Sequence, residues 1–258
     1  MEKNVMLSRG DLQIFCKLTQ PDVGDIRRVV LSVHGLIGST EDDIQTSIAE
    51  EMEFFNSATL RFDLPAHGQS PMTNEDFTLE NCKISLLAAA EYVKQQFPQV
   101  EELCVFSTGF GAYLTLICLE DLMELTSNIR LVVQTPSVMM HETLLSMLHV
   151  SRPTFRAMGE LSFRSRRPLT VKYSFYESLL EHLALTTYPI PMLILHGECD
   201  THIPLEHIQH LRRLNEDAKL VIIPGAGHRF LEEGAWDMVL DLTRDWFEFE
   251  QVLMTDWQ

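Results

Sequence analysis

Residues 29–38, VVLSVHGLIG, decide the fold that this sequence predicts. The first five form a nearly continuous β-branched and apolar run, which is typical of a strand buried on both faces of a mainly parallel sheet. The run ends at His34-Gly35, where a loop begins. From this stretch onward strands and helices alternate, which implies β-α-β units with right-handed crossovers. The fold class is therefore α/β, with a mainly parallel central sheet flanked by helices.

The remaining elements follow from hydrophobic periodicity and from turn and capping residues. A β-hairpin opens the fold, because two extended runs flank the turn residues Ser8 to Asp11. Its strands are expected at 5–7 and 12–18, and later strands at 29–33, 58–62, 103–106, 129–133, 192–196 and 219–223. Helices are expected at 41–54 with Ser39 or Thr40 as the cap, at 79–96 with Thr78 as the cap, and at 110–125, 205–214 and 230–249.

Residues 138–189 interrupt this alternation and predict a helical insertion without a clear strand. The segment is rich in methionine and carries a charge of +2, whereas the rest of the chain carries −19. We predict a lid, in which the methionines form an adaptable apolar wall and the arginines contact an anionic group of a ligand. A helical excursion with a solvated basic face is the alternative. Residues 1–258 are expected to form a single domain that contains this insertion.

The composition excludes several classes of protein. The chain has 258 residues, of which 45% are hydrophobic and 22% charged, as in ordinary globular proteins. The formal charge of −17 offers no basic face for phosphates, so no nucleic-acid partner is expected. The sequence has neither a signal-peptide pattern nor a run of about 18 apolar residues, which predicts a cytoplasmic protein without a membrane span. The five cysteines lack CxxC spacing and are expected to be reduced core thiols.

Chemically informative residues follow four of the predicted strands. His34-Gly35 and His67-Gly68 follow two of them, residues 197–200 (GECD) a third, and residues 224–228 (PGAGH) the last. Ligands of open α/β sheets bind outside the carboxyl ends of the strands, so these loops are expected to meet. A general base needs a carboxylate that orients it, and this layout offers His228 and Asp200 for the two roles.

Two of these loops resemble those of a known family. Residues 191–204, PMLILHGECDTHIP, and residues 223–228, IPGAGH, are similar to the acid and histidine loops of the α/β-hydrolases. The similarity runs across nearly the full length, is weakest in the insertion, and points to the serine esterase and acyl-peptidase-like branch that includes bacterial feruloyl and cinnamoyl esterases. The resemblance implies that Asp200 is the triad acid, that His228 is the base, and that the amides of Leu36 and Phe110 form the oxyanion hole. It implies an α/β-hydrolase fold and hydrolysis of small acyl or aryl esters without a cofactor.

The nucleophile of this family is missing from its expected position. The G-x-S-x-G elbow should lie between the strand that ends near residue 106 and the next helix, where residues 107–111 read STGFG. Gly109 therefore occupies the position of the serine. Glycine tolerates the strained backbone of such a turn, so the turn is kept while the hydroxyl is lost. Ser107 stands where the family usually has a glycine that permits close packing.

The sequence offers other candidates for the attacking group. Ser107 and Thr108 adjoin the apex of the turn, but either would need a shifted register. Cys104 and Cys199 are more typical of small core residues. A water molecule activated by His228 is a further candidate, since triad enzymes that lack one member keep about 10³- to 10⁴-fold acceleration over water.

The other histidines and the binding wall complete the candidate site. His67 is expected to be structural, as part of a D-x-x-x-H-G turn, and the histidine spacing predicts no metal site. We expect His34, Gly35, Met139 and Met140 to contact the substrate.

Two functions remain open. The first is a carboxylic-ester hydrolase with weak or rerouted chemistry at His228 and Asp200. The second is a non-catalytic pseudo-hydrolase that binds a small acyl or aromatic ester or acid. A third interpretation is that Gly109 was introduced to disarm a serine esterase. The sequence decides neither the substrate nor whether the chain forms a homodimer.

Overall fold

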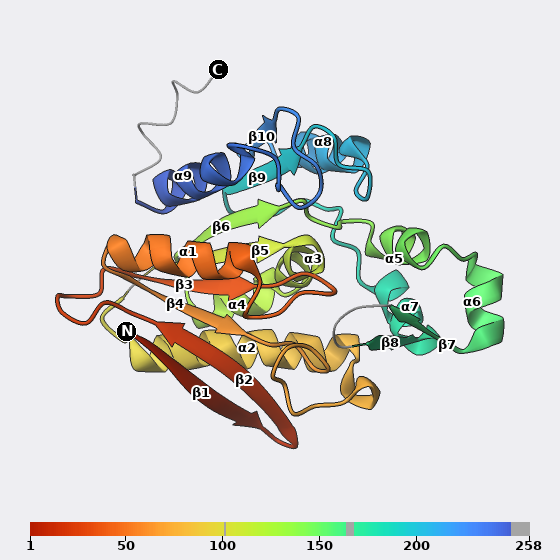
Figure 1. Ribbon diagram of the computed structural model, residues 1–258, viewed down its shortest axis with the longest axis horizontal. Coiled ribbons are helices and arrows are strands. Elements are labelled where there is room, and N and C mark those ends of the chain that lie inside the picture. Colours follow the sequence, from red (N-terminus) through yellow and green to blue (C-terminus); the bar gives the residue numbers. More distant parts are fainter. Residues whose placement is uncertain (101, 164–167, 249–258) are drawn as a thin grey trace.

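The computed structural model describes residues 1–100, 102–163 and 168–248. Its centre is an eight-stranded sheet with the order β1-β2-β4-β3-β5-β6-β9-β10 (Figure 1). The pairs from β4 to β10 are parallel, while β1 and β2 form an antiparallel hairpin and β2 pairs antiparallel with β4. The mainly parallel sheet and the opening hairpin are therefore confirmed. The strands are β1 (Glu2–Arg9), β2 (Leu12–Thr19), β3 (Arg28–Val33), β4 (Ser57–Phe62), β5 (Leu103–Thr108), β6 (Ile129–Gln134), β9 (Met192–Gly197) and β10 (Lys219–Ile223).

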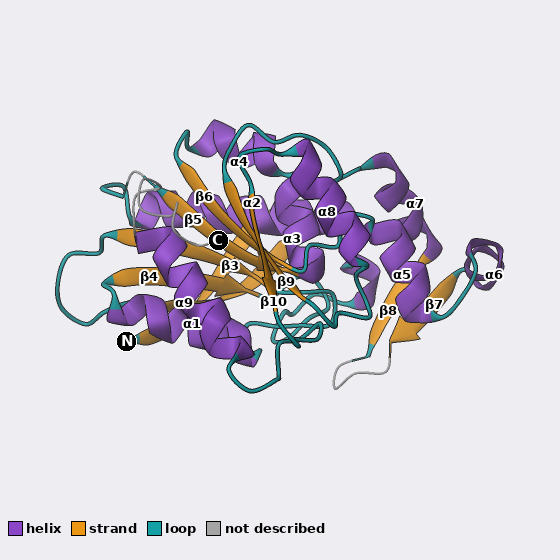
Figure 2. Cartoon of the chain, turned by 90° about the horizontal axis from the view of Figure 1, so that it is seen from above, coloured by secondary structure: helices purple, strands orange, loops and turns teal. Residues whose placement is uncertain are grey.

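Helices cover both faces of this sheet, as Figure 2 shows. Alternate residues of β3 enter two separate cores: Val30 packs on one side, and Val29 and Leu31 on the other. This is the physical reason for the continuous apolar run in the sequence, because both faces of the strand are buried. On the Val30 face lie α1 (Asp43–Phe54) and α9 (Ala235–Glu248), and on the opposite face α2 (Leu79–Gln96), α3 (Gly109–Ile117), α4 (Leu119–Leu125) and α8 (Leu205–Leu214), with the short 3₁₀ helix η1 (Asn74–Asp76) preceding α2.

Helix α1 begins later than predicted because of tertiary contacts. Thr78 caps α2 as predicted, since its hydroxyl accepts the amide of Asn81 at 3.1 Å. The N-cap of α1 is Asp42, however, and not Ser39 or Thr40. The Thr40 amide donates to Asp63 at 2.7 Å and its carbonyl accepts from Arg61 at 2.7 Å, so tertiary bonds hold this backbone outside the helix.

Two other helices also differ from the prediction. The helix expected at 110–125 is divided at Cys118 into α3 and α4. The last helix begins at Ala235 and not at residue 230, because Phe230 and Gly234 have φ values of 54° and 75°, which are incompatible with a right-handed helix.

The insertion is not purely helical. It lies beyond the carboxyl ends of the parallel strands (Figure 1) and contains α5 (Met140–Leu148), α6 (Arg152–Met158), β7 (Glu160–Phe163), β8 (Leu169–Lys172) and α7 (Tyr173–Glu181). The expectation that it holds no strand is wrong, because β7 and β8 pair antiparallel. Burial alternates along β8, but each strand has only four residues, which is too short for a clear period in the sequence. Arg164, Arg166 and Arg167 lie outside the described residues.

The five cysteines are free thiols. Four are buried, and burial raises their pKa values, that of Cys118 to about 12. Cys199 is exposed, so its expected place in the core is wrong. Within the described ranges, no helix has the length and apolar character needed to cross a membrane.

A close approach between α3 and the end of β3 depends on Gly111. A Cβ on this residue would lie 2.4 Å from the carbonyl oxygen of His34 and 2.5 Å from that of Val33. Both obstacles are backbone atoms and cannot move aside as a side chain would. Gly111 therefore brings α3 against the strand that leads into the Leu36 loop.

We expect Gly111→Ala to lower the free energy of unfolding by about 1–3 kcal/mol, because the added methyl group overpacks this contact. Urea denaturation followed by circular dichroism measures the change. Gly35→Ala is the matched control, since its Cβ would lie 3.6 Å from the nearest atoms, an ordinary contact. Equal stability of the two variants would contradict the close-approach argument.

Candidate active site

A cavity of about 300 Å³ opens at the carboxyl ends of the parallel strands. Its wall is assembled from the segments that follow five strands, together with α5 and the starts of α1 and α9. The loop after β3 contributes Leu36, the start of α3 after β5 contributes Gly109, and the loops after β6, β9 and β10 contribute Ser137, His202 and His228. The fold thus brings together residues that are separated by up to almost 200 positions in the sequence.

His228 and Asp200 form a hydrogen-bonded pair at this cavity. The Nδ1 atom of His228 lies 2.8 Å from Oδ2 of Asp200, whose side chain is completely buried. The other carboxylate oxygen accepts the amides of His202 at 2.7 Å and Ile203 at 3.0 Å. This carboxylate favours the tautomer with the proton on Nδ1, which leaves Nε2 of the neutral ring as the acceptor, as a general base requires.

The hydrogen bonds also set the charge of Asp200. Burial alone raises its pKa, but the bond with His228 and the amides of Ile203 and His202 outweigh burial, so the net pKa lies below its usual value. The carboxylate is therefore ionised at neutral pH and holds the imidazole in one orientation.

Gly109 has the backbone conformation expected of the elbow. It is the first residue of α3, directly after β5, and its φ is 50°, in the left-handed region. An ideal Cβ built on Gly109 would lie 4.0 Å from Oγ of Ser137 and meets no closer atom among the described residues, apart from its chain neighbours and its own helix. The site thus has room for a side chain that the sequence does not supply.

The predicted oxyanion-hole residues line the same cavity. Phe110 is the second residue of α3, so its amide lies among the N-terminal N–H groups that have no acceptor within the helix. Leu36 is held from behind by His67, whose Nε2 lies 2.5 Å from the Leu36 carbonyl oxygen. Leu36, from the loop after β3, and Phe110, from the start of α3, therefore both belong to the wall that Gly109 lines.

His34 supports this loop from behind the wall. Its Nε2 accepts the amide of Leu64 at 3.1 Å and its Nδ1 donates to the Gly35 carbonyl at 2.8 Å. Burial lowers the pKa of His34 to about 4, which keeps the ring neutral. His34 does not line the cavity, whereas Gly35 does, so the expected substrate contact of His34 is replaced by a structural role.

Of the remaining candidate substrate contacts and nucleophiles, some line the cavity and others do not. Met140 lines the cavity, but Met139 does not. Ser107 is fully buried with its Oγ 3.5 Å from the Val132 carbonyl, and Cys104 is buried in β5. Neither residue, nor Cys199, belongs to the cavity wall, whereas Thr108 does.

Sequence reasoning missed several residues of this wall. They lie at or after the carboxyl ends of β6 and β10, at the starts of α1 and α9, or on α5, and the strand-end rule could have found the first group. The missed residues are Asp42, Asp43, Ile44, Gln134, Thr135, Ser137, Thr143, Met147, Arg229, Leu231 and Trp236.

Among the residues that the structure describes, the arginine at the cavity lies outside the insertion. Arg229, on the loop after β10, lines the cavity, whereas Arg152 donates to the hydroxyl of Tyr173 at 3.2 Å. Asp42 lies on the same wall as Arg229. Burial raises the pKa of Asp42, and the charge of Arg229 counteracts this shift.

One group of side chains has the composition of a metal site. Asp200, His202 and His228 offer ligand atoms that lie within 4.8 Å of one another. The carboxylate of Asp200 already accepts three hydrogen bonds, from His228 and the two amides. Both oxygens of this carboxylate therefore have partners within the protein.

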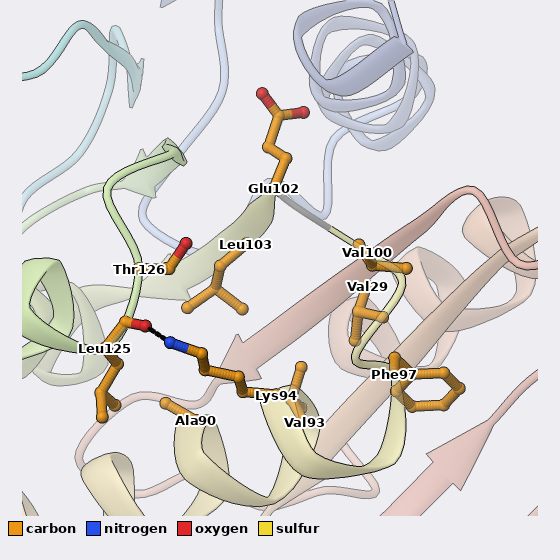
Figure 3. Close-up of a pocket in the computed structure, with 10 residues that line it drawn as sticks. All are labelled: Val29, Ala90, Val93, Lys94, Phe97, Val100, Glu102, Leu103, Leu125 and Thr126. Carbon is orange, nitrogen blue, oxygen red and sulfur yellow. Dashed lines mark hydrogen bonds between the residues drawn. The ribbon is translucent and has the colours of Figure 1, made fainter.

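A second cavity lies at the opposite end of the sheet, between α2 and the amino ends of β3 and β5 (Figure 3). Its wall is mostly apolar, and Lys94 crosses it to donate a hydrogen bond to the Leu125 carbonyl. Its volume of about 40 Å³ is enough for about one to three water molecules and not for an organic substrate.

The architecture is that of a hydrolase. It combines a parallel sheet, a glycine at a strand-to-helix turn and the hydrogen-bonded pair of His228 and Asp200. The model of the alpha/beta hydrolase family matches residues 29–242, and the chain belongs to that family.

Solved structures share this fold at low sequence identity. Est1E from Butyrivibrio proteoclasticus with ferulic acid bound is 20% identical, with a TM-score of 0.80 over 94% of this chain and 97% of Est1E. A putative hydrolase from Agrobacterium vitis S4 is 18% identical, with a TM-score of 0.80 over 96% and 99% of the two chains.

A curated relative, a putative carboxymethylenebutenolidase from Yersinia pestis, is 43% identical over 60 residues. That match spans 19% of this chain and only 22% of the relative.

We expect Asp200→Asn to destabilise the protein in a pH-dependent way. Because the pKa of Asp200 is lower in the folded than in the unfolded state, its stabilisation is complete above its ordinary pKa of about 4. It is lost as the pH falls through the folded-state pKa. The variant should therefore unfold about 1–3 kcal/mol more easily at neutral pH, and the difference should shrink below about pH 4.

Urea denaturation at a series of pH values measures this effect. Asp217→Asn, at an exposed position, is the control and should match the wild-type protein throughout. If the free energies of unfolding of Asp200→Asn and wild type differed by the same amount at every pH, the lowered pKa of Asp200 would be contradicted.

Proposed function

We propose that this protein hydrolyses small carboxylic esters, with His228 as the general base. The observation that carries the proposal is the 2.8 Å bond between His228 and the buried Asp200 at the cavity that Gly109 and Phe110 line. A protein that only bound a ligand would have no need for a buried carboxylate that fixes the tautomer of this histidine. The preserved turn at Gly109 and the adjoining amides support the same activity.

The residues divide the chemistry between them. His228 takes the proton of an attacking hydroxyl group and returns it to the leaving alcohol, while Asp200 stabilises the imidazolium that forms in between. The amides of Leu36 and Phe110 stabilise the negative charge that develops on the carbonyl oxygen. Gly109 has no hydroxyl, so the attacking group comes from elsewhere.

The cavity wall favours an acyl or aryl ester. Apolar side chains dominate away from the dyad, and their contacts suit an alkyl chain or an aromatic ring. The volume of about 300 Å³ agrees with a small substrate, as does the ferulic acid held by Est1E, a protein of the same fold. The apolar wall comprises Ile37, Ile44, Met140, Met147, Leu231 and Trp236.

We extend the proposal to the insertion, residues 138–189, as a lid within a single domain. Helix α5 supplies Met140, Thr143 and Met147 to the cavity wall. A shift of α5 would change both the volume of the site and its access to water, which is how lids act in enzymes.

A second candidate function is the binding of a small acyl or aromatic acid without turnover. Gly109 is the observation that favours it, because the residue removes the family's nucleophile while the cavity persists. A carboxylic acid that stabilises the protein in a thermal-shift assay, together with an absence of ester turnover, would support this alternative.

We expect His228→Ala to reduce ester turnover by about 10²- to 10⁴-fold, the usual contribution of a general base. Hydrolysis of p-nitrophenyl acetate and methyl ferulate provides the measurement. His210→Ala, on the exposed face of α8, is the control and should keep wild-type turnover. If wild-type protein hydrolyses neither ester above the buffer rate, or if His228→Ala is equally active, the proposed function is wrong.

We expect Gly109→Ser to raise ester turnover by about 100-fold or more, because the added hydroxyl completes the triad. The open space around the Cβ position accommodates this side chain. Gly109→Ala carries the same backbone strain without the hydroxyl, so it should show no increase. An inactive but folded Gly109→Ser variant would instead favour the binding function.

A further inference from the structure

Ser137 presents a hydroxyl group beside the position that Gly109 leaves empty. Its Oγ lies 4.0 Å from the ideal Cβ of Gly109. The residue is 3% exposed and lines the same cavity as His228 and Phe110. Within the described parts of the chain, the Ser137 hydroxyl has no hydrogen-bond partner, so it is available to a group in the cavity.

The strand order places Ser137 on the side of Gly109 that faces the dyad. Going across the sheet, β5 leads to Gly109, β6 to Ser137, β9 to Asp200 and β10 to His228. All four strands are parallel, so these loops share one edge. Along the order of strand ends, Ser137 therefore lies between Gly109 and the dyad.

The backbone around Ser137 is fixed by two hydrogen bonds, one to the start of α3 and one to β9. The Ser137 amide donates to the Gly109 carbonyl at 3.2 Å, and the Thr135 amide donates to the Leu195 carbonyl at 2.8 Å. Thr135 has a φ of 44°, which is rare for a β-branched residue. Such strain persists only where surrounding contacts enforce it, and it concentrates at functional sites.

We propose that Ser137 is the nucleophile of this protein and takes the place of the serine that is absent at position 109. This inference rests on the proposed ester hydrolysis and assigns its attacking group. It replaces an elbow serine on β5 with a serine on the neighbouring strand end, while His228, Asp200 and the amides of Leu36 and Phe110 keep their roles.

The reaction proceeds in two balanced halves. Oγ of Ser137 forms a bond to the ester carbonyl carbon and passes its proton to Nε2 of His228, and the amides of Leu36 and Phe110 stabilise the oxyanion. Collapse breaks the ester C–O bond, and the alcohol leaves with the proton from His228. Water then attacks the acyl-Ser137 ester and gives a proton to His228. The second collapse releases the acid and returns that proton to Ser137.

Covalent labelling with a fluorophosphonate tests this assignment directly. Trypsin separates the candidates, because Ser107, Thr108 and Gly109 lie on peptide 95–130, whereas Ser137 lies on peptide 131–156. Mass spectrometry of wild-type protein should find the adduct on Ser137. Ser137→Ala and His228→Ala should both lose it, and Ser107→Ala, a buried serine outside the cavity wall, should keep it.

Ester turnover of the same variants supplies the second readout. Ser137→Ala should lose about 100-fold or more of the wild-type rate. Its urea midpoint should be unchanged, since the hydroxyl makes no internal hydrogen bond among the described residues. The double variant Gly109→Ser with Ser137→Ala should regain turnover, with its adduct moved to peptide 95–130.

The outcomes separate the two proposals. An adduct on peptide 95–130 of wild-type protein overturns the assignment of Ser137. So does turnover that needs His228 and survives in Ser137→Ala, which would indicate water as the nucleophile, and ester hydrolysis itself would still stand. An adduct on Ser137 without turnover of any tested ester keeps Ser137 as a reactive serine and overturns the proposed function. Absence of both adduct and turnover overturns both.

Discussion

The site depends on one constraint, which is the parallel pairing of the strands at the centre of the sheet. The register aligns Val33 with Ser107, Thr108 with Gln134, and Gly197 with Ile223. These strands therefore end at nearly the same level, and the segments that follow β3, β5, β6, β9 and β10 line the same cavity. The hydrogen bonds of the sheet fix this alignment, so the loops can differ in sequence without changing where they meet.

Position 109 has the turn of a nucleophile elbow but lacks the nucleophilic hydroxyl group. A φ of 50° strains any residue with a side chain, and a serine hydrolase accepts that strain to expose its nucleophile. Glycine adopts the same conformation without cost, so the turn forms here although the residue carries no hydroxyl. Unlike position 109, the pair of His228 and Asp200 keeps its functional side chains. His228 and Asp200 keep a short bond, and Asp200 keeps its amide donors, so the imidazole is held in the orientation that the proposed general base needs.

Much of the fold and part of the site were predictable from the sequence, for identifiable reasons. The strands of the sheet are long apolar runs, and the dyad lies in two motifs whose order and spacing are specific. The hairpin of β7 and β8 was missed because four-residue strands give no clear period. His34 was assigned to the substrate because it follows a strand, but its two ring nitrogens bind the backbone of Leu64 and Gly35 behind the wall.

The sequence alone determined the alternation of strands and helices, the membership of Asp200 and His228 in one site, and the absence of a serine at the elbow, because each is encoded in local residue order. Only the tertiary structure decided what lies beside that empty position. Gly109 and Ser137 are 28 residues apart, and no spacing rule connects them. They become neighbours because β5 and β6 pair in parallel and the Ser137 amide binds the Gly109 carbonyl, contacts that exist only once the sheet has formed.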